Sequence, residues 1–570
     1  MRRGFRTLIL TTAAFAAAVA FWILSTLPPS AVRLSPSLPA TRVTGAYHVH
    51  SVRSDGTGTP DEIARAAQSA GLQFVILTDH GDGTRAPDPP AYRDGVLCID
   101  AVEINTSGGH IVALGLRAST PYPLAGEARD VIEDIHRLGG VAIAAHPDSP
   151  KPELRWRAQL SAAYDGIEWI NADSEWRDDK PRDILAAAVR SLIRPPEAIA
   201  TLFSRPARTL QRWDAAARIR PVFGMAALDA HARISWREDE EPRQRTLLAR
   251  PSYDAIFATL AQTVVLDAPL ANDARADADR LMEAIAAGRS FSIVRAFAGP
   301  GDLEFSATTP AGVVPMGGRV AAGPSITFRA QVLQAAGARL VLTRMGSEIS
   351  AGSGSLQWSG AAEPGVYRVE VQWPGMTTPW LMSNPIVIEG NPPTPDAGRP
   401  PEIDGDPATL VMVPVAADDP SWVVEKDPAS QAVTVLDPPS RRLDYQLAPG
   451  APHSQYAALA ASVSDRSGVE FIEFTARASA PMRVSMQVRL FGGKDGQRWR
   501  GSAYADETPR PVKLWLRDLE PAGFVTSQRP NFAPIQALLF VVDTLNAKPG
   551  TGGTLWISDV RLGVRKPSQR

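Results

Sequence analysis

The sequence predicts a multidomain protein in which an N-terminal transmembrane helix precedes an α/β barrel and two β-sandwiches. Three observations lead to this expectation. An uncharged stretch follows a basic N-terminus, short apolar runs then alternate with helical stretches, and period-2 patterning takes over after about residue 300. The 570 residues are enough for several domains, and a hydrophobic content of 44% is ordinary for globular cores.

The first element expected is a membrane helix over residues 1–27. Arg2, Arg3 and Arg6 precede an uncharged stretch from Thr7 to Leu27, which as a helix spans about 31 Å, close to the hydrocarbon thickness of a bilayer. Basic residues before this stretch favour a cytoplasmic N-terminus and export of the rest of the chain to the periplasmic side of the inner membrane. A retained signal anchor is favoured over a cleaved signal peptide, because the stretch is long for a cleavable signal. A buried soluble helix is the third alternative.

The second element is an α/β module over residues 45–300, reached through a linker at 28–44 that is rich in Pro and Ser. Alternating strands and helices favour a parallel arrangement, and a barrel in particular, with the active site at the C-terminal ends of the strands. The expected strands are Ala46–His50, Phe74–Thr78, Val96–Ile104, His110–Leu116, Val141–Ala145, Gly166–Ile170 and Pro221–Leu228, and the expected helices lie near 60–70, 126–138, 180–193, 196–217 and 276–287.

The remaining elements are β-sandwiches. Apolar residues at alternate positions, as from Ile326 to Val332, predict a small Ig-like sandwich over 301–390. A Pro-rich linker at 391–407 follows, and strand-like segments over 408–565 predict a larger jelly-roll sandwich.

Aromatic residues in the last module suggest one further partner. Trp499, Tyr504 and Trp515 could stack on sugar rings, although ordinary core or scattered surface packing is the favoured alternative. The segment Leu555–Leu562 resembles the closing strand of galactose-binding-like jelly rolls, so carbohydrate binding by this domain is an expectation by analogy.

Charge and cysteine content exclude other classes. A formal net charge of −2 gives no reason to expect nucleic-acid binding through bulk charge. Cys98 is the single cysteine, so an intrachain disulfide cannot form even in an exported protein.

The chemistry of the chain is concentrated in its histidines, six of which lie at the ends of apolar runs and are interleaved with acids. The potential metal ligands are His48, His50, Asp55, His80, Glu103, His110, His146, Asp229 and His231. A lone histidine of this kind would be interpreted as a satisfied core residue. This many imidazoles and carboxylates, without a thiolate, suit two or three Zn²⁺, Mn²⁺ or Fe²⁺ ions in a hydrolytic site.

Three residues beside the ligands are weaker candidates for a catalytic role. Asp79 could orient the imidazole of His80, and Arg53 and Arg233 could bind phosphate oxygens through bidentate contacts. A turn carboxylate and solvated loop arginines are the alternatives.

The order of these residues resembles the PHP (polymerase and histidinol phosphatase) superfamily. The resemblance rests on His48-x-His50-Ser51-x-x-Ser54-Asp55-Gly56, then Leu77-Thr78-Asp79-His80, then Glu103, His110, Ala145-His146-Pro147 and Asp229-x-His231, and it covers residues 44–297. It implies a distorted seven-stranded (β/α) barrel with a trinuclear metal site, in an exported bacterial branch whose members carry additional β-domains.

The resemblance also implies how the ligands are shared. One ion would bind His48, His50, Glu103 and Asp229; a second would bind Glu103, His110 and His146; a third would bind Asp55, His80 and His231. A water bridging two ions becomes hydroxide near neutral pH and can attack phosphorus. We therefore expect hydrolysis of a small or polymeric phosphate mono- or diester. The alternatives are carboxyl-ester or carbamate hydrolysis, and a non-catalytic carbohydrate-binding protein of the cell envelope.

Overall fold

The computed structural model describes residues 2–34, 38–158, 162–233, 251–333, 335, 337–390, 410–452, 454–466, 468–490, 496–523 and 535–565. The chain forms two compact units. The first contains Met1–Gly81, Pro87–Ala118 and Ile132–Pro393, and the second contains Asp82–Ala86, Ser119–Val131 and Thr394–Arg570. The second unit therefore includes two short segments from the first half of the sequence. The Pro-rich linker predicted at 391–407 lies outside the described residues.

Two sheets carry the strands of the α/β module. One has the order β10 (Phe223–Ala227), β9 (Gly166–Asn171), β8 (Val141–Ala144), β7 (Gly109–Leu114) and β6 (Val102–Thr106). Within it, β10, β9 and β8 are parallel, whereas β7 runs antiparallel to both β8 and β6.

The other sheet extends beyond the α/β module. Its order is β16 (Arg319–Ala321), β23 (Ile386–Glu389), β21 (Gly365–Gln372), β22 (Leu381–Ser383), β12 (Ser290–Ile293), β11 (Ala261–Val265), β2 (Arg42–Val49), β3 (Phe74–Leu77), β5 (Val96–Asp100) and β4 (Ala91–Arg93). The strands β2, β3 and β5 are parallel, while β11 and β12 are antiparallel to their neighbours.

The predicted seven-stranded (β/α) barrel is therefore wrong. Its expected strands are divided between two sheets, and β12 pairs with β22, so one of these sheets continues into the region after residue 300. The error has a physical cause. Every residue of β5, β7 and β9 is buried, and a strand buried on both faces has the same continuous apolar sequence whether its neighbours are parallel or antiparallel.

Helices flank these sheets where the sequence predicts most of them. They are α2 (Pro60–Ser69), α3 (Ala128–Arg137), α4 (Ala172–Glu175), α5 (Pro181–Arg190), α6 (Pro195–Ala200), α7 (Ala207–Ile219), α8 (Tyr253–Phe257) and α9 (Ala274–Ala286). The start of α2 is fixed by a capping box between Thr59 and Glu62. The single helix expected over 196–217 is broken into α6 and α7, and Pro206 directly precedes α7.

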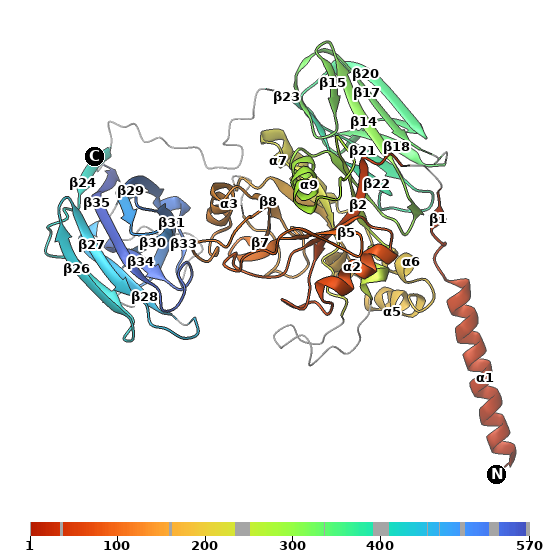
Figure 1. Ribbon diagram of the computed structural model, residues 1–570, viewed down its shortest axis with the longest axis horizontal. Coiled ribbons are helices and arrows are strands. Elements are labelled where there is room, and N and C mark those ends of the chain that lie inside the picture. The colour runs from red at the N-terminus through yellow and green to blue at the C-terminus, as the bar shows by residue number, and fades with distance from the viewer. Residues whose placement is uncertain are drawn as a thin grey trace, which may run out of the picture. The chain divides into compact units, whose positions relative to one another are not determined.

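The N-terminal residues form α1 (Arg2–Ser25), drawn in red in Figure 1. In the part of the chain that the structure describes, no helix combines the length and apolar composition needed to cross a membrane. The transmembrane anchor predicted over residues 1–27 is corrected accordingly.

Strands after residue 300 confirm the period-2 interpretation. A sheet of β15 (Gly312–Pro315), β14 (Leu303–Thr309), β17 (Gly323–Val332) and β20 (Ser355–Ala362) lies beside strands β18 (Arg339–Arg344), β19 (Ser347–Ser353) and β21. In the second half of β17 buried and more exposed residues alternate. Phe328 of β17 stacks on Tyr367 of β21 with ring centroids 4.6 Å apart, so aromatic packing joins the two layers.

The C-terminal part is a β-sandwich, shown in cyan and blue in Figure 1. One sheet contains β26 (Gln431–Asp437), β27 (Ser440–Gln446), β35 (Gly552–Arg565), β29 (Val469–Ala478) and β32 (Arg510–Trp515), with β24 (Leu410–Pro414) paired to β35. The other contains β25 (Val423–Lys426), β28 (Tyr456–Arg466), β34 (Ile535–Asp543), β30 (Met482–Arg489), β31 (Arg498–Ala505) and β33 (Glu520–Pro521). One apolar cluster, which includes Ile472, Val484, Phe540 and Leu562, fills the space between the sheets.

The three aromatic residues considered for sugar stacking do not share a surface. Trp499 is 1% exposed and belongs to the sandwich core. Tyr504 lies on the opposite face of the same strand, β31, because side chains alternate along a strand. Trp515 lies on the other sheet and packs edge-on against Phe471, with centroids 5.0 Å apart. They therefore form no common platform.

Candidate metal centre

The predicted ligands converge because strand ends from distant parts of the sequence meet. Parallel bridges join Val49 to Ala230 and His80 to Glu103. The amide of His50 donates to Ala230 O at 3.0 Å, and the amide of Ala230 donates to His48 O at 3.2 Å. The chain around His48 is thereby held against the segment that carries Asp229 and His231.

The most enclosed group contains His48, His50, Glu103 and Asp229. His48 Nε2 lies 3.1 Å from His50 Nε2, 3.2 Å from Glu103 Oε2 and 3.4 Å from Asp229 Oδ1. His50 Nε2 lies 3.3 Å from Glu103 Oε2 and 3.2 Å from Asp229 Oδ1. Four ligand atoms that surround a tetrahedral Zn²⁺ at about 2.0–2.1 Å lie about 3.3–3.4 Å from one another. The distances from the two imidazole nitrogens to Glu103 and Asp229 lie close to this spacing, and His48, His50 and Asp229 form a group able to hold an ion.

Glu103 connects this group to a second one through its other carboxylate oxygen. Glu103 Oε1 lies 2.9 Å from His110 Nδ1 and 2.9 Å from His146 Nε2. On the side of Oε2, His80 Nδ1 also approaches to 3.2 Å. A carboxylate whose two oxygens face different sets of imidazoles can bridge two ions, which an imidazole bound through one nitrogen cannot do.

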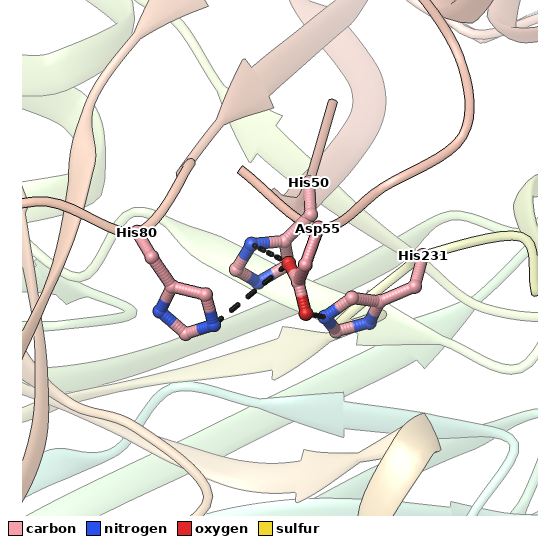
Figure 2. Close-up of side chains that lie close together, drawn as sticks. All are labelled: His50, Asp55, His80 and His231. Atoms are coloured by element: carbon pink, nitrogen blue, oxygen red, sulfur yellow. Dashed lines mark ion pairs between the residues drawn. The ribbon is translucent and has the colours of Figure 1, made fainter. Parts of the chain in front are cut away.

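The third group is nearer to solvent. Figure 2 shows His50, Asp55, His80 and His231 directed toward one another. Asp55 Oδ2 lies 3.1 Å from His231 Nε2, and Asp55 Oδ1 lies 3.4 Å from His50 Nδ1 and 3.9 Å from His80 Nε2. The side chains of His80 and Asp55 are 34% and 30% exposed, whereas those of His48 and His50 are fully buried. The cluster is therefore open on the side of this group.

Several ligands adopt strained backbone conformations. His48, His146 and Asp229 have φ values of 64°, 28° and 49°. Residues other than glycine rarely occupy this left-handed region, and such strain is concentrated at functional sites. At His48 it coincides with a shift in the register between β2 and β3, which changes the direction of its side chain relative to a regular strand.

The structure also identifies a residue that the sequence analysis missed, Glu168 in the middle of β9. Its Oε1 lies 2.5 Å from His48 Nδ1. Its Oε2 accepts hydrogen bonds from the amide of His146 at 2.7 Å and from Asn171 Nδ2 at 2.9 Å. The only sequence signal is a carboxylate inside the apolar run Gly166–Trp169, because a buried acid requires partners.

The three weaker candidates are placed as follows. Asp79 accepts hydrogen bonds from the amide and the hydroxyl of Ser51, each at 2.7 Å, and from Ser54 Oγ at 2.7 Å, so it orders the loop after His50. Arg53 forms ion pairs with Asp88 and, at 3.5 Å, with Asp100.

Arg233, which is close to the ligands, pairs with Asp55 at 3.0 Å, and its side chain is 9% exposed. Of the two arginines, it is the one that contacts a predicted metal ligand.

Electrostatic interactions within the cluster shift the pKa values of its histidines and carboxylates. Burial lowers the pKa of His50, but its hydrogen bonds with Asp229 and Glu103 outweigh this effect and raise it to about 10. His48 behaves alike, because Glu168, Asp229 and Glu103 raise its pKa well above the ordinary value despite burial. Burial raises the pKa of Glu103, but the neighbouring histidines lower it well below its usual range. The buried carboxylates therefore require positive charge, which protons on the histidines or divalent ions can supply.

Comparison with known proteins finds similarity over limited parts of the chain. No family model matches the chain. Over 120 residues it is 32% identical to an uncharacterized protein of Methanocaldococcus jannaschii, covering 21% of this chain and 69% of that protein; the chain belongs to the family of that protein. Over 85 residues it is 35% identical to the 3',5'-nucleoside bisphosphate phosphatase of Chromobacterium violaceum, covering 14% of this chain and 30% of the phosphatase. A short part of the chain is thus similar to less than a third of that phosphatase.

Similar solved structures include carbohydrate-binding modules. The family 11 module from Clostridium thermocellum, in complex with a mixed-linked tetrasaccharide, has 12% identity and a TM-score of 0.23, covering 27% of this chain and 98% of the module. A CBM4 structure has 17% identity and a TM-score of 0.19, covering 25% of this chain and 95% of that chain. Likenesses this weak assign no function.

Proposed function

We propose that the protein is a metal-dependent hydrolase of the PHP type that acts on a phosphate mono- or diester. The observation that carries this proposal is the position of Glu103. One buried carboxylate faces His48 and His50 through one oxygen, and His110 and His146 through the other. This geometry is that of a bridging ligand in a centre with more than one ion, which is suited to hydrolysis.

The described residues fit two or three divalent ions of the Zn²⁺, Mn²⁺ or Fe²⁺ type. His48, His50, Glu103 and Asp229 would hold the first ion, and Glu103, His110 and His146 the second. Asp55, His80 and His231 would hold a third. When bound, such ions supply an activated water at neutral pH and neutralise the charge of a phosphoryl group.

The chain's own residues determine where the substrate enters. His80 and Asp55 are the most exposed members of the cluster, so a phosphoester would approach from their side. Arg233 lies at this side, paired with Asp55, and adds positive charge. The named phosphatase relative supports a phosphoester over a carboxyl ester or carbamate.

The test combines metal analysis with three chromogenic substrates: p-nitrophenyl phosphate, bis-p-nitrophenyl phosphate and p-nitrophenyl acetate. We expect hydrolysis of at least one phosphoester by the metal-loaded protein, and its loss in His48→Ala and Asp229→Ala. His136→Ala is the matched control, because His136 pairs with Asp165 and belongs to none of the metal groups. Hydrolysis of the acetate alone would replace the proposal by ester hydrolysis. Wild-type activity in either ligand variant would refute the site.

A further inference from the structure

The outer nitrogens of the ligand imidazoles have unequal partners. His48 Nδ1 faces the carboxylate of Glu168 at 2.5 Å. In contrast, His146 Nδ1 faces the carbonyl of Leu154 at 3.2 Å. His231 Nδ1 faces the carbonyl of Asp229 at 2.8 Å, with the Asp229 carboxylate farther away at 3.7 Å. A carboxylate partner makes an imidazole a stronger metal ligand than a neutral carbonyl does, and it fixes the tautomer in which Nε2 is free to bind.

Glu168 is itself held in one orientation. Its second oxygen accepts hydrogen bonds from the amide of His146 and from Asn171 Nδ2, so both carboxylate oxygens have partners although the residue is 1% exposed. Asn171 Nδ2 also donates to Asp229 Oδ2 at 3.2 Å. This contact leaves Asp229 Oδ1 directed at His48 and His50. Glu168 and Asn171 thus position two ligands of the same ion.

The group of His48, His50, Glu103 and Asp229 is also more deeply buried than the group of Asp55, His80 and His231. His48, His50 and Glu103 are at most 1% exposed and Asp229 is 7% exposed. The side chains of His80, Asp55 and His231 are 34%, 30% and 19% exposed. Charges attract more strongly where water is excluded, provided that the ligands are already oriented.

We propose that Glu168, supported by Asn171, is the positioning residue that makes the group of His48, His50, Glu103 and Asp229 the tightest of the metal sites. This site fills first and keeps its ion, while the group of Asp55, His80 and His231 exchanges its ion with solvent. The inference rests on the metal centre of the proposed function, but not on its substrate.

The test is a titration of the full-length, chelator-stripped protein with Zn²⁺ against a chromophoric chelator, repeated with Co²⁺ to record the absorption spectrum of each phase. We expect at least two phases. Glu168→Gln should weaken the tight phase about 10- to 100-fold and leave the weak phase unchanged. His231→Ala should remove a weak phase and leave the tight one. Asn171→Ala should weaken the tight phase by less than Glu168→Gln does.

Glu175→Gln is the matched control. Glu175 is a carboxylate of the same unit, with hydrogen bonds from Ser204 and no ligand imidazole as partner, so both phases should stay unchanged. Glu168→Asp tests rescue and should restore part of the affinity if the carboxylate, and not only the fold, is required. A single phase in the wild type, or equal weakening of every phase by Glu168→Gln, would overturn the inference. Two phases without hydrolysis would refute the proposed function and leave the inference standing.

Discussion

The candidate metal centre and the buried pair of Arg368 and Asp214 both place charges in the interior of the first unit, but they neutralise them differently. Arg368 is 0% and Asp214 3% exposed. The guanidinium contacts both carboxylate oxygens and lies 4.6 Å from the ring centroid of Trp213. In the metal centre, Glu103 and Asp229 face imidazoles, whose charge depends on protonation. The pair is neutralised by a permanently charged guanidinium, while the charge of the cluster depends on protons on its histidines or on bound cations.

This difference implies competition between protons and metal ions. The raised pKa of His50 favours its protonated form in the metal-free protein. Metal binding at His50 should then release a proton, so the apparent metal affinity should rise with pH.

The largest effect of a single substitution is expected at Glu103, in the candidate metal centre. Glu103→Gln keeps the shape of the side chain but removes the bridging charge. We expect activity to fall about 100-fold or more and the bound metal to decrease, while the far-UV circular dichroism stays unchanged. Metal content and the rate of phosphoester hydrolysis provide the measurements. Full metal content in this variant would show that Glu103 is not a ligand.

A substitution in the buried pair of Arg368 and Asp214 should instead lower stability without changing metal binding. Arg368→Ala leaves the buried carboxylate of Asp214 unpaired and should lower the free energy of unfolding by about 3–5 kcal/mol, with metal stoichiometry preserved in the fraction that folds. Urea denaturation measures this change. As a control, Arg339→Ala breaks a pair with Glu348 whose side chains are 47% and 48% exposed, so its cost should stay below about 1 kcal/mol. Equal costs would contradict the distinction between the two pairs.

A buried acid in the second unit, Glu127, extends the comparison to the dependence of stability on pH. Burial raises the pKa of Glu127 from 4.5 to about 8, and the nearby carboxylates of Asp130 and Glu520 add to this effect. At Glu127 the folded state therefore binds a proton more tightly than the unfolded state does, so the contribution of this residue to stability is largest below pH 4.5 and is lost as the pH rises toward 8.

Glu127→Gln mimics the protonated form and should remove this contribution to the pH dependence, making the variant more stable than the wild type above pH 8 by up to about 5 kcal/mol. Denaturation across the pH range provides the measurement. Parallel curves for the two proteins would rule out this role for Glu127.

The smallest effect is expected where a cation meets an aromatic ring on the surface of the sandwich. Arg477 lies 3.9 Å from the ring centroid of Trp556. Arg477→Ala should cost about 0.5–1 kcal/mol, measurable as a small shift of the thermal midpoint, and Arg477→Lys should recover part of it. A loss as large as that of Arg368→Ala would mean that surface and interior cations contribute equally.

Sequence patterns predicted the local elements better than their assembly. The strand ends at His50, His80 and His146 could be recognised because apolar runs stop at polar residues. The pairing of the strands could not be predicted from the sequence, since β6 and β7 form a hairpin from apolar runs that look like those of parallel strands. The strands β11 and β12 were missed because they are short and interrupted by Gln262, Thr263 and Ser292.

The residues of the candidate site also divide into those that the sequence predicted and those that it did not. His, Asp and Glu at strand ends are visible as a set, and the structure brings their side chains together. Glu168 was not found because its role depends on packing against His48, which lies 120 residues away in the sequence. Likewise, the contacts of Asp79 with Ser51 and Ser54 depend on the fold of a loop, and the sequence shows only a carboxylate next to a histidine.

The left-handed backbone at His48, His146 and Asp229 has an evolutionary consequence. Glycine adopts this conformation without strain, so each position could mutate to a residue that suits the backbone better but binds no metal. Selection for thermal robustness alone would then favour loss of the ligands. Family members that retain all three residues against this drift would do so because an ion is needed, and inactive paralogues should carry glycine or asparagine at these positions first.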